Sequence, residues 1–99
     1  MLTIQKSIRD REAFYRLSGR LDAVSAPELT RELRETLPGV DRLTLDLEET
    51  EYIASAGLRV LLSARRALGR QGSVKLLHVS DSVLEVLETT GLAAALEID

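Results

Sequence analysis

The chain has 99 residues and a formal net charge of −3, with 44% hydrophobic and 29% charged residues, which is the balance of one globular domain spanning residues 1–99. It has no cysteine and a single histidine, which excludes disulfide frameworks, thiolate metal sites and histidine-rich metal sites. The negative charge and the scarcity of aromatic residues argue against direct binding of nucleic acid. There is no long apolar run and no signal-peptide pattern, so we expect a cytoplasmic protein that does not insert into membranes.

Alternating apolar residues predict two strands at the start of the chain, one at Met1–Ile8 and one from Ala13 to about Ser18. The polar run Arg9-Asp10-Arg11-Glu12 separates them and indicates a turn. Because the connection is short, we expect the two strands to pair as an antiparallel hairpin.

A first helix is predicted after the second strand, where Ser25 and Glu28 have the spacing of a capping box. Leu29, Leu33 and Leu37 recur every fourth residue, which indicates one buried stripe. Pro38-Gly39 then ends the helix.

The second half of the chain alternates strands and helices. A third strand covers the alternating leucines at 43–47, and the acidic residues 48–51 form a connection after which Tyr52-Ile53 packs back toward the core. The second helix starts at Ser55 and ends at residues 69–72, and a fourth strand follows at residues 74–77. Ser80 caps a third helix with Val83, Leu84 and Leu87 inward and Gly91 just past its end, and residues 92–98 add a turn and a short last strand.

This order predicts an α/β fold with a mixed sheet of four or five strands, an antiparallel N-terminal hairpin and parallel inner strands. The loop at Gly19–Ser25 and the loop at Glu48–Ser55 follow the carboxyl ends of two strands. In α/β sheets this end carries function, so we expect the two loops to lie side by side there.

The residue pattern of the second helix predicts three different surfaces. Its sheet-facing residues should be Gly57, Val60, Leu61, Ala64 and Leu68, whereas Arg59, Ser63, Arg66 and Arg70 should face solvent. Leu58 and Leu62 lie on the border, either as core edges or as contacts for a partner. Every charge from residue 57 to residue 75 is positive, which indicates either a solvated face or a patch for an acidic surface.

Ser55 opens the second helix and is followed by two small residues. We expect its hydroxyl to cap the helix, which contributes roughly 1 kcal/mol. Ala56 and Gly57 should leave the serine uncovered, although glycine costs about 1 kcal/mol relative to alanine inside a helix. Free N–H groups and the helix dipole favour an anion at this position, so Ser55 is a suitable site for phosphorylation.

Other candidate chemistry is weak. His78 has no partner arrangement that predicts catalysis, and we interpret it as structural. Four acidic residues could bind a hard cation but lack the spacing of a calcium loop, namely Asp46, Glu48, Glu49 and Glu51. We therefore expect no enzyme activity, no catalytic residues, no metal site and no cofactor.

Three segments resemble a known family: LSGRLD at 17–22, LDLEETEYIASAGLRVLL at 45–62 and TTGL at 89–92. Together they resemble the STAS domain, and more narrowly the bacterial anti-sigma factor antagonists. The resemblance extends from about residue 12 to residue 92 and implies a small mixed sheet with helices on one side.

The resemblance also implies a function and partners. The unphosphorylated protein would bind an anti-sigma factor, a serine kinase with a histidine-kinase-like ATP fold, and release the sigma factor. Phosphorylation of Ser55 by that kinase would end the binding, and a metal-dependent serine phosphatase would restore it. The implied partner-binding surface comprises Gly19, Arg20, Asp22, Ser25, Ala54, Ser55, Ala56, Gly57, Leu58, Arg59 and Leu62.

The sequence departs from the family pattern beside the serine. Ala54 and Ala56 stand where the family usually has an aspartate and a second hydroxyl residue. If the aspartate orients the serine for phosphate transfer, Asp22 or Asp46 would have to replace it. Two alternatives therefore stay open: a non-phosphorylated STAS subunit or scaffold of a transport or signalling complex, and a small enzyme or ligand carrier using the acidic loop.

Overall fold

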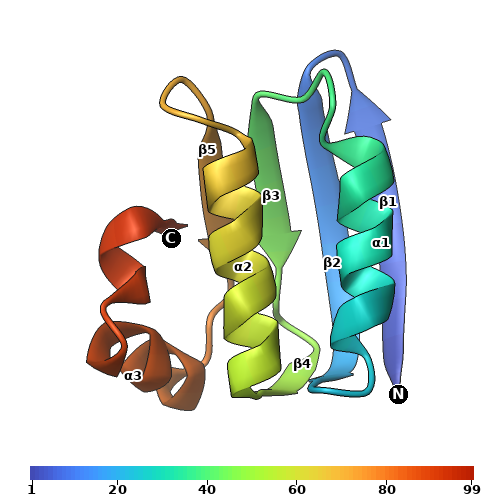
Figure 1. Cartoon of the computed structure of the whole chain (residues 1–99). Coiled ribbons are helices and arrows are strands. Elements are labelled where there is room, and N and C mark those ends of the chain that lie inside the picture. The colour runs from blue at the N-terminus through green and yellow to red at the C-terminus, as the bar shows by residue number, and fades with distance from the viewer.

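The computed structural model describes residues 1–99 and contains one six-stranded sheet with three α-helices. Helices α1 and α2 cover one face of this sheet, and α3 lies to the side of the sheet next to β5 (Figure 1). The elements are β1 (Leu2–Arg9), β2 (Glu12–Leu21), α1 (Ala26–Thr36), β3 (Arg42–Asp46), β4 (Thr50–Ile53), α2 (Ser55–Ala67), β5 (Ser73–Leu77), α3 (Asp81–Thr89), η1 (Leu92–Ala95) and β6 (Glu97–Ile98).

The strand order is β1-β2-β3-β5-β6, and β4 pairs with β2 beside this path. Strands β1 and β2 are antiparallel, whereas every other pair is parallel. The predicted mixed sheet and N-terminal hairpin are thereby confirmed. Strand β4 corrects the expectation of a connection over these residues, because a strand of four residues shows little alternation. Ile53 packs inward as predicted, but the prediction is wrong for Tyr52, which is exposed.

Strand β2 is longer than predicted because it changes partners at Gly19. Its first half pairs with β3, and its last residues pair with β4 after an irregularity between Gly19 and Arg20. Gly19 has φ +108°, and a Cβ there would lie 2.2 Å from the carbonyl oxygen of Met1. Only glycine fits this close approach, which lets the strand continue to Leu21.

The core is a single cluster of 23 buried apolar residues. The predicted stripe of α1 is buried at Leu29, Leu33 and Leu37, and on α3 Val83 and Leu87 are buried while Leu84 is only partly buried. None of the helices is long and apolar enough to cross a membrane.

The capping box predicted for α1 is wrong. The Ser25 hydroxyl donates to the carbonyl oxygen of Arg20 at 2.7 Å and accepts from the N–H of Asp22 at 3.0 Å, so it holds the preceding loop. No side chain caps α1. At α3 the prediction is confirmed, because the Ser80 hydroxyl accepts from the N–H of Val83 at 3.3 Å.

Candidate functional site

The N-terminus of α2 lies at the same end of the molecule as β4 and the start of α1 (Figure 1). The N–H of Ala54 donates to the carbonyl oxygen of Leu21 at 2.9 Å, which extends the β2–β4 ladder by one residue. The carbonyl oxygen of Ala54 then accepts from the N–H groups of Gly57 and Leu58. Ala54 is therefore the N-cap, and the prediction that Ser55 caps the helix is wrong.

Ser55 is instead the first residue of α2 and is exposed to solvent. Its hydroxyl caps nothing, and the N–H groups of Ser55 and Ala56 have no backbone acceptor. The first turn of the helix carries no acidic residue. The positive end of the helix dipole is thus unopposed there, which favours negative charge on the Ser55 oxygen.

Gly57 serves packing rather than exposure of the serine. It is buried, and a Cβ at this position would lie 2.7 Å from Cγ of Leu21 and 3.0 Å from Cγ2 of Ile53. The first turn of α2 therefore approaches the ends of β2 and β4 more closely than any side chain permits. This close packing fixes the position of Ser55, two residues earlier, relative to the ends of β2 and β4.

The two predicted loops do lie side by side. The N–H of Gly19 donates to the carbonyl oxygen of Glu49 at 2.9 Å, in addition to the bond between Ala54 and Leu21. The Arg20 guanidinium lies 4.6 Å from the centroid of the Tyr52 ring, a cation–π contact that joins the same two segments.

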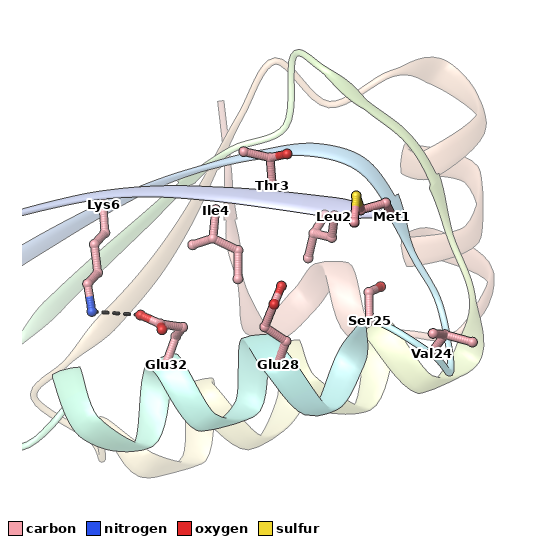
Figure 2. Close-up of a pocket in the computed structure, with 9 residues that line it drawn as sticks. All are labelled: Met1, Leu2, Thr3, Ile4, Lys6, Val24, Ser25, Glu28 and Glu32. Atoms are coloured by element: carbon pink, nitrogen blue, oxygen red, sulfur yellow. Dashed lines mark hydrogen bonds and ion pairs between the residues drawn. The ribbon is translucent and has the colours of Figure 1, made fainter.

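Asp22 stabilises the turn that leads into α1. Its Oδ1 accepts from the N–H groups of Val24 and Ser25 and from the Ser25 hydroxyl. The pKa of Asp22 is lowered, first by the Ser25 N–H and then by the Val24 N–H, with smaller help from Arg20. Ser25 itself is buried, and its side chain points from the start of α1 toward the beginning of β1 (Figure 2).

The remaining predicted site residues differ in how far they are exposed to solvent. Leu58 and Leu62 are partly buried and pack against the core, which favours their interpretation as core edges. Arg59 is exposed and forms no ion pair. Ala56 is partly buried.

Sequence reasoning missed two exposed apolar residues at this end of the molecule. Val24 in the loop before α1 is 89% exposed, and Tyr52 on β4 is 45% exposed. Residues 50–53 are buried at both ends and exposed at Glu51 and Tyr52, so no alternation in the sequence signals Tyr52. Nothing in the local sequence pattern predicts that Val24 is an exposed apolar residue.

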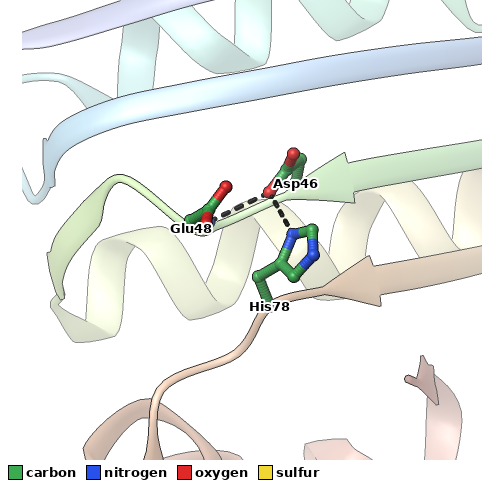
Figure 3. A group of neighbouring side chains, drawn as sticks. All are labelled: Asp46, Glu48 and His78. Atoms are coloured by element: carbon green, nitrogen blue, oxygen red, sulfur yellow. Dashed lines mark hydrogen bonds and ion pairs between the residues drawn. The ribbon is translucent and has the colours of Figure 1, made fainter.

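The second polar cluster lies at the ends of β3 and β5 and contains Asp46, Glu48 and His78 (Figure 3). Asp46 is 2% exposed, and its Oδ1 contacts His78 Nδ1 at 2.9 Å and the N–H of Glu48 at 3.0 Å. Its Oδ2 accepts from the Arg16 guanidinium at 3.2 Å. Both oxygens thus have protein partners, and the guanidinium supplies positive charge where a cation would have to bind.

These contacts also bear on the missing family aspartate. The carboxylate of Asp46 is held by His78 and Arg16, and that of Asp22 is held by its own loop. Each carboxylate is therefore engaged by structural partners. Neither carboxylate forms a hydrogen bond with Ser55.

The Asp46–His78 pair predicts a pH-dependent stability. Burial alone would raise the pKa of Asp46, but hydrogen bonds from His78, Glu48 N–H and Arg16 outweigh it and lower the pKa. The hydrogen bond to Asp46 raises the pKa of His78 above 6.5, with smaller support from nearby Glu48. Stabilisation by charged His78 is thus complete below pH 6.5 and is lost as the pH rises through the raised folded value.

We expect the thermal unfolding midpoint to decrease as the pH rises above 6.5 and through the raised folded pKa of His78. His78→Asn should remove most of this slope, and asparagine suits the φ of +57° at this position. Thermal melts followed by circular dichroism across the range measure both. An equal slope in the variant would contradict the assignment.

The comparisons with known proteins agree with this geometry. The sequence matches the family described as "Mlab, STAS domain" over residues 4–97. The chain belongs to the STAS domain family. The anti-sigma-B factor antagonist of Listeria monocytogenes is 34% identical over 85 residues, which cover 83% of this chain and 74% of that protein.

Solved structures show the same fold. The anti-sigma factor antagonist from Mycobacterium paratuberculosis matches with a TM-score of 0.88 at 22% identity, over 99% of this STAS chain and 85% of that chain. The phosphorylated form of SpoIIAA from Bacillus matches with a TM-score of 0.78 at 20% identity, over 98% of this chain and 91% of that one. The fold class and the family predicted from the sequence are thereby confirmed.

Proposed function

We propose that this STAS domain is an anti-sigma factor antagonist switched by phosphorylation of Ser55. The observation that carries the proposal is the exposed serine at the first position of α2, beside N–H groups that have no acceptor. The name of the Listeria relative supports the same function. The unphosphorylated form binds an anti-sigma factor that is itself a serine kinase, and the sigma factor is released.

The proposed contact surface combines Ser55 with exposed side chains of the neighbouring loop and helix. Arg20, Val24, Tyr52 and Arg59 are exposed at or near this end of the molecule. Asp22 and Ser25 keep the loop in shape, Gly19 and Gly57 allow the close approaches, and Ala54 caps the helix. Ala56, which is partly buried, completes the surface, and Leu58 and Leu62 support it by packing α2 against the edge of the core.

A phosphate on Ser55 would leave the fold intact and oppose the complex. At the free helix N-terminus it is neutral or stabilising by about 0.3–1 kcal/mol. At an interface it would be desolvated, and an unpaired buried charge costs about 2–5 kcal/mol of affinity. The switch therefore acts on binding rather than on stability, and a metal-dependent serine phosphatase in the same cytoplasm would reverse it.

The test is the intact mass of the protein after incubation with ATP in a lysate of its native host. We expect one added phosphate on the wild type and none on Ser55→Ala. A phosphate on both proteins, or on neither, would contradict the assignment of Ser55. Thermal melts of both proteins before incubation control for folding.

A second candidate is a non-phosphorylated STAS subunit of a transport complex. Ala54 favours it, because no carboxylate stands beside Ser55 in the first turn of α2. This candidate predicts an unmodified Ser55 in the native cell and co-purification with membrane transport components. The intact-mass experiment separates the two candidates.

A further inference from the structure

A groove runs between α1 and α2 on the helical side of the sheet. One cavity of about 450 Å³ lies at its end near Ala56 and Arg59, and a second of about 230 Å³ continues it toward Leu37 and Ala67. The two cavities share four lining residues, Thr30, Arg34, Val60 and Ser63, so they form one continuous depression.

Three arginines border this groove: Arg31 and Arg34 from α1, and Arg59 from α2. None of them forms an ion pair, and no acidic residue lines either cavity. The protein has a net charge of −3, so this concentration of unpaired positive charge is local. The groove therefore has a sign opposite to that of the whole chain.

The charged residues of α1 that line depressions on its two sides have opposite signs. Glu28 and Glu32 face β1 in a separate depression, and Glu32 contacts the Lys6 ammonium at 2.6 Å (Figure 2). Arg31 and Arg34 face α2 instead. No acidic residue of α1 forms an ion pair with the arginines of the groove.

The floor of the groove is apolar. Its lining includes Ala26, Pro27, Leu33, Leu37, Val60, Ala64 and Ala67. A small anion would find no buried polar side chain here, only exposed guanidinium groups and the hydroxyls of Thr30 and Ser63. An apolar floor between positive rims instead fits a segment with one apolar and one acidic face.

We propose that the α1–α2 groove binds an acidic amphipathic helix of a partner protein, with apolar side chains on the floor and carboxylates on Arg31, Arg34 and Arg59. This inference rests on the proposed function for the partner's identity, because Arg59 lies one helical turn after Ser55 on α2. The partner's contact would then extend from the switch serine along the groove.

The test uses a synthetic helical peptide with leucine on one face and glutamate on the other, about 12 residues long to match the roughly 16 Å of α1. Titration into the ¹⁵N-labelled chain should shift the NMR resonances of the backbone amides of Thr30 and Ser63. The amide resonances of Gln5 and Ser7 on β1 should not change. A matched peptide with glutamine in place of glutamate should bind at least threefold more weakly. Equal binding of both peptides, or no shift in the groove, would overturn the proposal.

A pair of double variants separates the groove from general attraction. The double variant Arg34→Gln with Arg59→Gln should bind the acidic peptide at least threefold more weakly, because two ion pairs at the rim are removed. Arg66→Gln with Arg70→Gln makes the same change in net charge on exposed residues outside the groove, and should change binding less than twofold. Equal weakening by the two double variants would overturn the proposal.

This experiment needs neither ATP nor a kinase. A successful titration, together with no added phosphate on Ser55 in the intact-mass experiment, would retain the groove and reject the phosphorylation switch. A phosphorylated Ser55 with no binding in the groove would retain the switch and reject the groove.

Discussion

Ser55→Asp is expected to reduce affinity for the anti-sigma factor kinase by about 30-fold or more, because a desolvated, unpaired charge at an interface costs about 2–5 kcal/mol. The substitution places a carboxylate at the exposed first position of α2, where the first turn has no acidic residue. Isothermal titration calorimetry with the purified kinase measures the change.

Stability should move in the opposite direction. A carboxylate in the first turn of a helix stabilises it by about 0.3–1 kcal/mol, so the thermal midpoint of Ser55→Asp should be unchanged or slightly higher. Ser55→Ala is the matched control and should keep most of the affinity, since the hydroxyl caps nothing in the free protein. Wild-type affinity for Ser55→Asp would show that the serine lies outside the interface.

Gly57→Ala is expected to destabilise the protein by about 1–3 kcal/mol, the usual cost of overpacking a core. Helix propensity alone predicts the reverse, a gain of about 1 kcal/mol. Packing should prevail because the new Cβ would lie 2.7 Å from Cγ of Leu21, which is fully buried. Chemical denaturation of the two proteins gives the difference in free energy of unfolding.

Ser63 supplies the matched control for Gly57. It lies on the exposed side of the same helix, so Ser63→Ala should be more stable than Ser63→Gly by about 1 kcal/mol, as propensity dictates. The two positions should therefore respond to the same exchange with opposite signs. A stabilised Gly57→Ala would mean that the first turn of α2 can move away from β2.

The parts of the fold predicted well from the sequence are those with a clear period. The leucines of α1 and the predicted sheet-facing residues of α2 repeat at helical spacing, and the structure buries them except for Leu68, which is partly buried. The predictions of serine caps at the starts of α1 and α2 were wrong because sequence periodicity carries no information about the loop and strand contacts that precede a helix. Ser25 is captured by the loop before it, and the ladder from β4 continues through Ala54, so tertiary hydrogen bonds decided both helix starts.

The site shows the same division. Ser55, its small neighbours and the adjacent loop are contiguous motifs and could be predicted from the sequence. The α1–α2 groove could not, because Arg31, Arg34 and Arg59 come together only when the two helices pack on the sheet. Gly57 was recognised as unusual, but its reason lies in the buried side chains of Leu21 and Ile53.

The central claim is that one phosphate on Ser55 controls binding without changing the fold. The most direct measurement is the affinity of a single preparation for the kinase in three states: unmodified, fully phosphorylated, and after phosphatase treatment. We predict that the phosphate lowers affinity by about 30-fold or more, that phosphatase restores it, and that circular dichroism stays constant. Equal affinity in all three states would contradict the switch.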